Sequence, residues 1–519
     1  MIPISLALRL LLGGSLLFGL VAFLSTRFGK RTPKSCLPPG PPAEPIIGHL
    51  RIIPEDHPEY QYTEWGKQYN SDVLHLNVLG RSIIILNSVE AAHDLLDKKG
   101  QNYADRPRFV LFEVMGWGIT LTFLRWGRKF KLHRKLMQSS FTPSACKLYR
   151  PIQEEEARKA AAEILASPGD WEYLLRKFST AVVLRIGFGL GISRTDDQYV
   201  KMAIDAEEAT GNGGVPAATF VDFFPALRFV PGWLLRLGPL EHARQSKAYI
   251  QKLHDAPWDS TEPEIRSGKA IIPSFMRTHL ERYIRNEETG QPNEATIADL
   301  KGAAGAISIA GGNTTWSTIV VCIMNMLLHP EVQKKAHAEI DTVVGHDRLP
   351  CFEDREKLPY LENVIQETTR WCPLSPVGVP HATLEDDTYR GMFIPKGSVV
   401  YANAYAMTHD ERNYSNPDVF DPDRYILKDQ GGKGEPYPEG PFGFGRRICP
   451  GQYLATAGVY IMITTLLATM EMRNPVGPDG TEILPRIKFT TGLSNKPEHF
   501  DCIMTPRSEK AKQLLLQYS

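Results

Sequence analysis

The chain has 519 residues, 42% of them hydrophobic and 23% charged, and its 59 basic side chains balance its 59 acidic ones. This is the composition of a globular protein with enough apolar sequence for a large core. Zero net charge, without a basic run, argues against nucleic acid as a partner. Seven dispersed cysteines argue against a disulfide framework and against cysteine-rich zinc or clustered iron–sulfur sites.

An apolar segment stands at the N-terminus. Residues 4–24 are interrupted only by Arg9, and a bilayer span needs about 20 residues. Basic residues follow at Arg27, Lys30, Arg31 and Lys34, which predicts that the rest of the chain stays on the cytoplasmic side. We therefore expect residues 1–36 to form a single-span membrane anchor, with a cleaved signal peptide as the alternative.

Residues 37–45, with the sequence LPPGPPAEP, are too rich in proline for a helix. They predict a stiff hinge, or a plain linker, between the anchor and the remaining residues 46–519. We find no repeat and no internal boundary in residues 46–519, which predicts one catalytic domain.

The predicted elements of that domain are mostly helical. Residues 75–87 have the β-branched content of two strands around a Gly-Arg turn. Helical periodicity dominates from about residue 91 to 328, with breaks in glycine- and proline-rich stretches. Strand signals return at residues 399–405 and in the last thirty or so residues. The expected fold class is mainly α with a minor β-sheet region.

One long apolar helix is predicted from about Ile297 to His329, where Pro330 stops it. Its middle carries Gly311-Gly312, Asn313, Thr314 and Thr315. Paired glycines in a helix cost about 1 kcal/mol each, so a reason is expected. Either a ligand presses against the backbone or the helix kinks, or the glycines mark a helix crossing with threonine hydroxyls bonded one turn back.

Two further stretches carry charged residues that are not specific to any function when each is taken alone. Glu367 and Arg370 stand three residues apart on one helix face and can pair, which alone is typical of a surface ion pair. Arg424 lies in the turn-prone segment FDPDRY.

The sequence FGFGRRICPG, residues 442–451, presents a lone cysteine. Cys449 precedes Pro450-Gly451 and an apolar helix, and a helix N-terminus stabilises a thiolate. Arg446 and Arg447 add positive charge. Gly443, Gly445 and Gly451 would let a large planar ligand approach the backbone. A reactive or structural cysteine in a glycine-rich turn is the plainer interpretation.

Taken together in this order, the motifs resemble the cytochrome P-450 superfamily of haem-thiolate monooxygenases, over essentially the whole chain. Residues 442–451 match its FxxGxRxCxG loop, ETTR its ExxR motif, PDRY its second arginine segment and AGGNTT most of its oxygen-activating helix. The anchor and hinge match its microsomal branch. The C-terminal tail is similar to fungal secondary-metabolism members of the O-methylsterigmatocystin oxidoreductase-like and tryptamine monooxygenase-like types.

The resemblance implies a cytochrome P-450 fold with haem b as cofactor. Cys449 would be the axial iron ligand, Phe442 would pack beside the sulfur, and Arg447 would pair with a haem propionate. Gly311 and Gly312 would make room for dioxygen, and Thr314 would position water. Glu367, Arg370 and Arg424 would form a structural network.

The same resemblance implies partners and a location. Electrons would come from an NADPH–cytochrome P-450 reductase docking near Lys129 and Lys131. The protein would be a single-pass endoplasmic reticulum membrane protein with a cytoplasmic catalytic domain. It would hydroxylate or otherwise oxidise a lipophilic small molecule, such as a terpenoid or polyketide intermediate of secondary metabolism.

Three positions depart from the family pattern or complete it differently. Asn313 replaces the usual acid before Thr314. Its amide is expected to act beside Thr314 by orienting a water molecule, but it cannot deliver a proton. The resemblance implies that Arg134 binds a propionate, but Phe130 stands where the family has a second propionate-binding residue, a tryptophan. Phe130 cannot donate a hydrogen bond, so that contact is either lost or passes to His133. His381 occupies the place of another propionate-binding Arg or His, or is an ordinary core histidine.

The expected substrate walls are residues 109–119, 213–224, 303–310, 374–379 and 491–493, which are mostly apolar without an ion-pair anchor. Three alternatives stay open: a haem-thiolate enzyme of an atypical rearrangement, isomerisation or dehydration, for which Asn313 speaks; a non-catalytic haem-binding protein; and a thiol enzyme without haem.

Overall fold

The structure is a computed structural model that describes residues 37–192, 198–211, 219–231, 238–269 and 272–518. The predicted anchor, residues 1–36, lies outside the described residues. The described chain is mainly helical, as expected. Its longer helices are α2 (Pro58–Gln68), α5 (Arg128–Ser140), α7 (Arg150–Ala166), α8 (Trp171–Phe188), α9 (Gln198–Gly211), α11 (Gly238–Arg266), α12 (Phe275–Glu288), α13 (Ile297–Leu328), α14 (Pro330–Val343), α15 (Pro359–Trp371), α17 (Gln452–Thr469) and α18 (Glu509–Leu516).

Short helices and strands complete the architecture. The short α-helices are α3 (Val89–Ala92), α4 (Val110–Met115), α6 (Pro143–Lys147), α10 (Phe220–Phe223) and α16 (Ala404–Thr408). The strands are β1 (Val73–Val78), β2 (Arg81–Leu86), β3 (His381–Ala382), β4 (Asp387–Tyr389), β5 (Met392–Ile394), β6 (Val399–Ala402), β7 (Met470–Arg473) and β8 (Ile503–Pro506).

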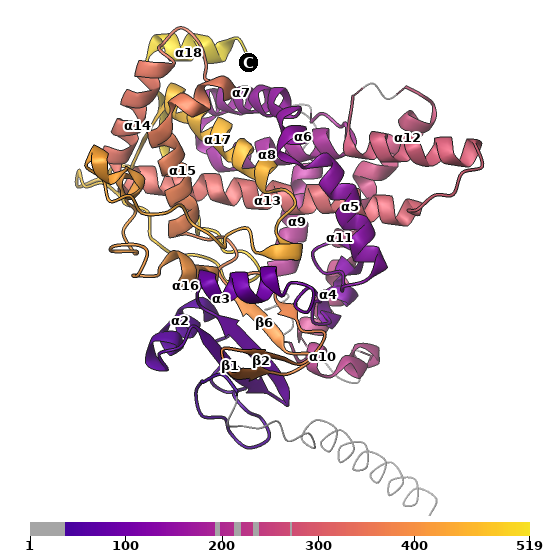
Figure 1. Ribbon diagram of the computed structural model, residues 1–519. Helices are drawn as coiled ribbons and strands as arrows, with labels where there is room; N and C mark the ends of the chain where they lie inside the picture. Colours follow the sequence, from indigo (N-terminus) through magenta and orange to yellow (C-terminus); the bar gives the residue numbers. More distant parts are fainter. Residues whose placement is uncertain (1–36, 193–197, 212–218, 232–237, 270–271, 519) are drawn as a thin grey trace, which may run out of the picture.

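Helix α13 crosses the middle of the helical layer, with α8, α15 and α17 packed around it (Figure 1). Its start is fixed by a capping box, in which Asp299 N donates to Thr296 Oγ1 at 3.2 Å and Thr296 N donates to Asp299 Oδ2 at 3.1 Å. It ends at Leu328, one residue before His329-Pro330. The helix predicted for residues 297–329 is therefore confirmed.

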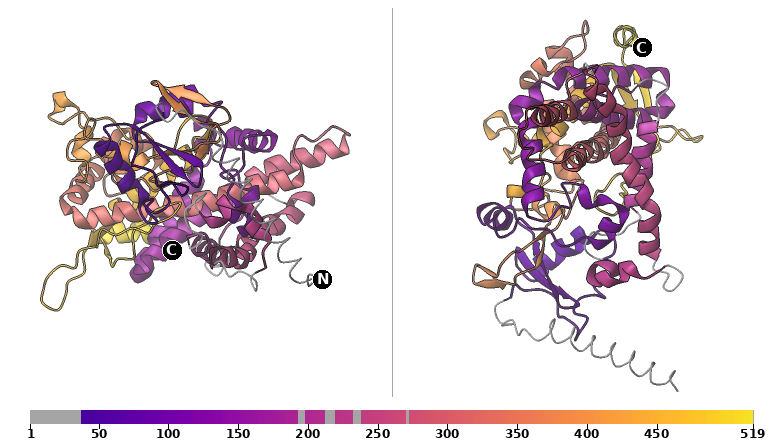
Figure 2. Two further views of the ribbon diagram at one scale, coloured as in Figure 1. Left: turned by 90° about the horizontal axis from the view of Figure 1, so that it is seen from below. Right: turned by 90° about the vertical axis from the view of Figure 1, so that its right-hand side faces the viewer.

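The main sheet has the order β1-β2-β6-β3 and lies to one side of the helical layer, in front of α13 when the molecule is seen from below (Figure 2). Strands β1 and β2 pair antiparallel, which confirms the predicted hairpin. Its turn is Leu79-Gly80 rather than Gly-Arg, with φ values of 48° and 79°, and two positive φ values are typical of a type I′ hairpin turn.

Two predicted strand regions are confirmed in part. Strand β6 ends at Ala402, because the side chain of Asn403 accepts a hydrogen bond from Ala406 N and starts α16 instead. Near the C-terminus β7 and β8 pair antiparallel, and the chain then ends in α18 rather than in another strand.

The proline-rich hinge is attached to the sheet at its described end. His75 N of β1 donates to Pro39 O at 3.0 Å, and His49 Nε2 lies 2.8 Å from Pro41 O. Residues 37–45 are thus held against the catalytic domain rather than forming a free linker.

Within the described residues, α13 and α17 are the two helices long and apolar enough to cross a membrane. Their most apolar windows are 67% and 72% buried inside the protein. Burial of this extent is typical of core helices.

Candidate active site

The lone cysteine lies in a closed loop in front of α17. Cys449 N donates to Phe442 O at 2.9 Å, which closes the loop over residues 442–449. Backbone N–H groups of Gly451 and Gln452, at the N-terminus of α17, bond to the sulfur. Gly445 is required by protein packing, since a Cβ there would lie 2.0 Å from Leu96 O. Of the three loop glycines, Gly443 and Gly451 line the cavity described below.

The electrostatics of the protein alone do not by themselves produce the predicted thiolate at Cys449. Burial raises the pKa of Cys449 above its ordinary value, although the two N–H groups and the charge of Arg134 act in the opposite direction. In the protein alone the thiol form is therefore favoured over the predicted thiolate. A coordinated metal ion deprotonates a thiol outright, so the site suits a sulfur that becomes anionic on metal binding.

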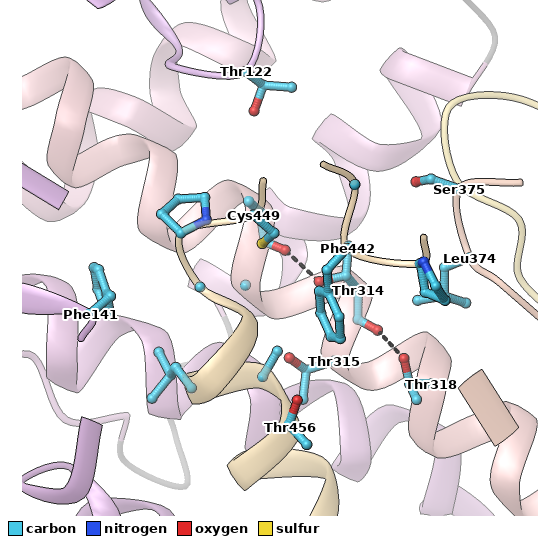
Figure 3. Close-up of a pocket in the computed structure, with 18 of the residues that line it drawn as sticks. Thr122, Phe141, Thr314, Thr315, Thr318, Leu374, Ser375, Phe442, Cys449 and Thr456 are labelled. Atoms are coloured by element: carbon cyan, nitrogen blue, oxygen red, sulfur yellow. Dashed lines mark hydrogen bonds between the residues drawn. The ribbon is translucent and has the colours of Figure 1, made fainter. Parts of the chain in front are cut away.

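A cavity of about 530 Å³ lies above the sulfur, between the cysteine loop and α13 (Figure 3). Cys449 and Phe442 line it from the loop, and Thr314 and Thr318 line it from α13. The hydroxyl of Thr314 donates to Ala310 O at 2.6 Å, one turn back. Its oxygen keeps acceptor capacity toward the cavity.

A helix crossing explains the first of the two glycines of α13, Gly311, but not Gly312. A Cβ on Gly311 would lie 2.5 Å from Val183 Cγ1 of α8, and one on Gly312 would lie 3.7 Å from Thr180 Oγ1. Helix α13 runs through both residues without interruption. The helix-crossing interpretation is thus confirmed for Gly311 alone, while the dioxygen role of Gly311 and Gly312 stays a prediction.

Two alanine substitutions separate packing from helix propensity. We expect Gly311→Ala to lower the free energy of unfolding by about 1–3 kcal/mol, because the new methyl group overlaps the stiff Val183 side chain. Gly312→Ala meets only ordinary contacts and should stabilise the protein by up to about 1 kcal/mol. Thermal unfolding of the two variants checks this, and equal Tm shifts would contradict it.

Buried cationic side chains line the cavity, and they show whether the site suits the anionic propionates of a haem. Arg447, 9% exposed, donates from Nε to Ala104 O, and both its Nη atoms are buried without a hydrogen-bond partner in the described part of the chain. Burial lowers the pKa of Arg447 to about 9. Arg106 is buried and also lines the cavity, and burial and Arg447 lower its pKa. Its guanidinium donates to backbone carbonyls, among them Val379 O at 2.6 Å, but has no carboxylate bound to it among the described residues. Such groups call for anionic partners, and the two propionates of haem b supply them.

His381 and Arg134 also line the cavity. His381 Nδ1 lies 2.9 Å from Tyr103 O, which can only accept, so Nδ1 is the protonated nitrogen. Burial and Arg106 hold the pKa of His381 well below its ordinary value, so its second ring nitrogen, Nε2, carries no proton in the protein alone. Nε2 could donate a hydrogen bond only after an incoming carboxylate had favoured its protonation. Arg134 Nη1 donates to Ile448 O at 2.5 Å, and its buried Nε has no partner.

The expectation that His133 replaces the missing tryptophan is wrong. His133 is fully buried, faces Asp299 at the start of α13 with Nε2–Oδ1 at 3.3 Å, and does not line the cavity. Phe130 does line it, and the Arg447 guanidinium lies 3.8 Å from the centre of its ring. Phe130 therefore supports an arginine by stacking instead of donating a hydrogen bond. The sequence analysis predicted neither the stacking of Arg447 on Phe130 nor the presence of Arg106 in the cavity wall.

The predicted network below the cysteine loop is confirmed. Glu367 accepts bidentate hydrogen bonds from Arg370 at 2.8 Å each, and Arg424 Nε lies 3.0 and 3.1 Å from the two carboxylate oxygens. All three side chains are fully buried. Arg370 also donates to the carbonyls of Thr408 and Pro417, so the network ties α15 to the segment leading to the cysteine loop.

The predicted substrate walls are right in part. Residues of 303–310 and 374–379 line the cavity, but none of residues 109–119 or 491–493 does. Helix α4 is instead buried in the hydrophobic core, and Leu493 O accepts from Ser375 Oγ. Segment 213–224 lies partly outside the described residues, and its described part does not line the cavity. The side chains of Phe178, Ser179 and Val182 on α8 form the wall that the sequence did not indicate.

Comparisons with known proteins agree with this site. A family model described as "Cytochrome P450" matches residues 38–501. The chain is 35% identical to "Cytochrome P450 monooxygenase 176" of Postia placenta, over 95% of each protein. It is 33% identical to "Cytochrome P450 monooxygenase ARMGADRAFT_974139" of Armillaria gallica, over 96% of this chain and 97% of that protein. It is also 33% identical to "Tryptamine 4-monooxygenase" of Psilocybe cyanescens, over 93% of this chain and 95% of that protein.

Proposed function

Because this chain belongs to the cytochrome P450 family and is a haem-thiolate monooxygenase, we propose that it oxidises a neutral lipophilic molecule, such as a terpenoid or polyketide intermediate of secondary metabolism. The observation that carries the proposal is the placement of Cys449 beneath a cavity whose opposite wall presents Thr314. Bound haem supplies dioxygen binding and activation at its iron.

The residues of the chain divide the remaining tasks. Cys449 would ligate the iron of bound haem, Arg447, Arg106 and Arg134 would hold its propionates, and Phe442 would pack beside the sulfur; all five residues line the cavity. Thr314, whose own hydroxyl proton bonds to Ala310 O, would hold a water molecule through the acceptor capacity of its oxygen, and that water would be the proton donor in the cavity. The apolar walls orient the substrate and exclude bulk water.

The charge of the cavity supports a neutral substrate. Among the described residues that line it there is no Asp or Glu, whereas three arginines and His381 are present. A buried ammonium group would have no carboxylate to compensate the loss of its hydration. One relative is named "Tryptamine 4-monooxygenase", so a cationic tryptamine analogue is a suitable ligand to compare with a neutral indole.

A pair of probes tests the substrate class. We expect tryptophol, a neutral indole, to bind with a Kd about tenfold lower than that of the trimethylammonium analogue of tryptamine. Both Kd values are measured from the change in the haem spectrum on titration. The quaternary nitrogen of that analogue cannot coordinate iron, so only its charge distinguishes it. Tighter binding of the cation would contradict a neutral substrate. The proposal as a whole is tested by NADPH-driven transfer of ¹⁸O from ¹⁸O₂ into a lipophilic product.

The partners follow from the same proposal. An NADPH–cytochrome P-450 reductase delivers the electrons and docks near the exposed Lys129 and Lys131 of α5. The apolar residues 4–24 anchor the protein in the endoplasmic reticulum membrane as a single span, with the catalytic domain in the cytoplasm.

One observation favours a second candidate. Asn313 cannot deliver a proton, and a haem-thiolate enzyme that rearranges, isomerises or dehydrates its substrate needs none from this position. Turnover without NADPH and reductase would establish this alternative. A non-catalytic haem-binding protein would show no turnover under either condition.

A further inference from the structure

The side chain of Asn313 contacts α8. Asn313 Oδ1 accepts from Arg176 Nη1 at 3.1 Å. Gly311, Gly312 and Asn313 thus face Val183, Thr180 and Arg176, which stand at i+7, i+4 and i along one face of α8. Asn313 does not line the cavity, whereas the next residue, Thr314, does.

Arg176 belongs to a charged cluster that joins several segments. Its Nη1 also donates to Glu207 Oε2 of α9, and Glu207 Oε1 lies 2.9 Å from Lys496 Nζ of the C-terminal loop. The Arg176 guanidinium lies 3.7 Å from the ring centre of Trp316 on α13. The side chains of Arg176 and Glu207 are only 8% and 22% exposed, so the pair is little screened by solvent. Arg176 and Lys496 both lower the pKa of the Glu207 carboxyl.

This cluster supports a weak turn of α13. Two glycines precede Asn313 and weaken the helix by about 1 kcal/mol each relative to alanine. The turn that presents Thr314 therefore needs support from outside the helix. A guanidinium can only donate, so Arg176 fixes the oxygen of the Asn313 amide toward α8. Glu207 in turn fixes the guanidinium, because the carboxylate and the Trp316 face hold it from two sides.

We propose that Arg176 and Glu207 are positioning residues for Thr314: Glu207 orients Arg176, Arg176 binds the Asn313 amide, and this anchor sets the Thr314 hydroxyl against the cavity. The anchor needs a hydrogen-bond acceptor at position 313 and a carboxylate on α9, not an acid at position 313. The inference concerns the same site as the proposed function and deepens it.

Carbon monoxide bound to the reduced, full-length holoenzyme is the probe, since its infrared stretching band responds to polar groups near the iron. The reference is Thr314→Val, which removes the hydroxyl and should displace the band. We expect Glu207→Gln and Asn313→Leu to broaden the band and move it toward that of the reference. Asn313→Asp should leave the band unchanged, because a carboxylate there still accepts from Arg176.

Glu163→Gln is the matched control. Glu163 pairs with Lys177, the neighbour of Arg176 on α8, at 2.9 Å with similar exposures of 12% and 19%. We expect Glu163→Gln to lower Tm about as much as Glu207→Gln while leaving the band in place. The proposal is overturned if Glu207→Gln and Asn313→Leu keep the wild-type band, or if Thr314→Val does not move it.

A second readout uses the reconstituted enzyme with NADPH and reductase. The hydrogen peroxide released per NADPH should rise about tenfold in Glu207→Gln and stay unchanged in Glu163→Gln, in line with the usual cost of losing a supporting contact. If Glu207→Gln fails to bind haem, Asn313→Leu serves as the test variant. The infrared experiment needs no substrate, so its failure is distinguishable from failure of the proposed oxidation.

Discussion

Replacement of Cys449 by alanine is expected to abolish the long-wavelength Soret band of the reduced carbon monoxide complex and all NADPH-driven turnover. The sulfur is the ligand that the loop, the N-terminus of α17 and the cavity together present, and among the described residues no cluster of His, Cys, Asp or Glu could replace it as a metal site. Expression of the variant in membranes, followed by the difference spectrum, measures the effect directly. The apolar core around the loop should keep the variant folded.

Cys372→Ala is the matched control for this prediction. Cys372 is also buried and lines the same cavity, but it stands at the C-terminus of α15, and burial raises the pKa of its thiol to about 12. Its removal should leave the Soret band in place. A long-wavelength band that persists in Cys449→Ala, or disappears in Cys372→Ala, would show that the axial ligand is assigned to the wrong residue.

Local motifs allowed the central residues of this site to be predicted from the sequence. Cys449, Thr314 and the Glu367–Arg370 pair depend on contacts within one loop or one helix turn, which short sequence patterns record. The long helix α13 was predicted for the same reason, because its cap and its stop signal are adjacent to it in the sequence.

Contacts between distant segments could not be predicted in this way. Arg176 and Asn313 are separated by 137 positions, and Arg447 and Ala104 by 343. No local pattern indicates that Gly311 meets Val183 of α8. The mistaken role of His133 has the same origin, since adjacent positions on α5 point to different neighbours: His133 to Asp299 and Arg134 to Ile448.

The thiolate predicted for Cys449 belongs to the haem-bound protein, whereas the protein alone favours the thiol. Helix N-termini and nearby arginines are visible in the sequence and favour a thiolate, whereas the cost of burial depends on the whole fold. In the protein without haem, burial raises the pKa of the Cys449 thiol by more than the two backbone N–H groups and Arg134 lower it. Of the two arginines predicted to act on the sulfur, Arg447 lines the cavity and Arg446 does not. Both Nη atoms of Arg447 are buried without a hydrogen-bond partner among the described residues.

The second large effect is expected for Glu367→Gln. The substitution keeps the shape of the side chain but removes the charge shared by Arg370 and Arg424, whose guanidinium groups are fully buried. Removing one partner of a buried ionic group leaves uncompensated charge and costs about 3–5 kcal/mol. Thermal unfolding should show this loss. The haem-loaded fraction should fall with it, since Arg370 and Arg424 bind carbonyls of the segment that leads to the cysteine loop.

Glu362→Gln tests whether the effect depends on burial. Glu362 lies on the same helix α15 and pairs with Arg355 at 2.9 Å, but both side chains are more than 20% exposed. Water screens such a pair, so its loss should cost at most about 1 kcal/mol. The buried network also receives hydrogen bonds from Tyr425 Oη and Asp421 N, which a glutamine accepts less strongly than a carboxylate. Equal Tm values for Glu367→Gln and Glu362→Gln would mean that the three buried charges contribute no more than a surface pair, and that packing alone holds α15 against the cysteine loop.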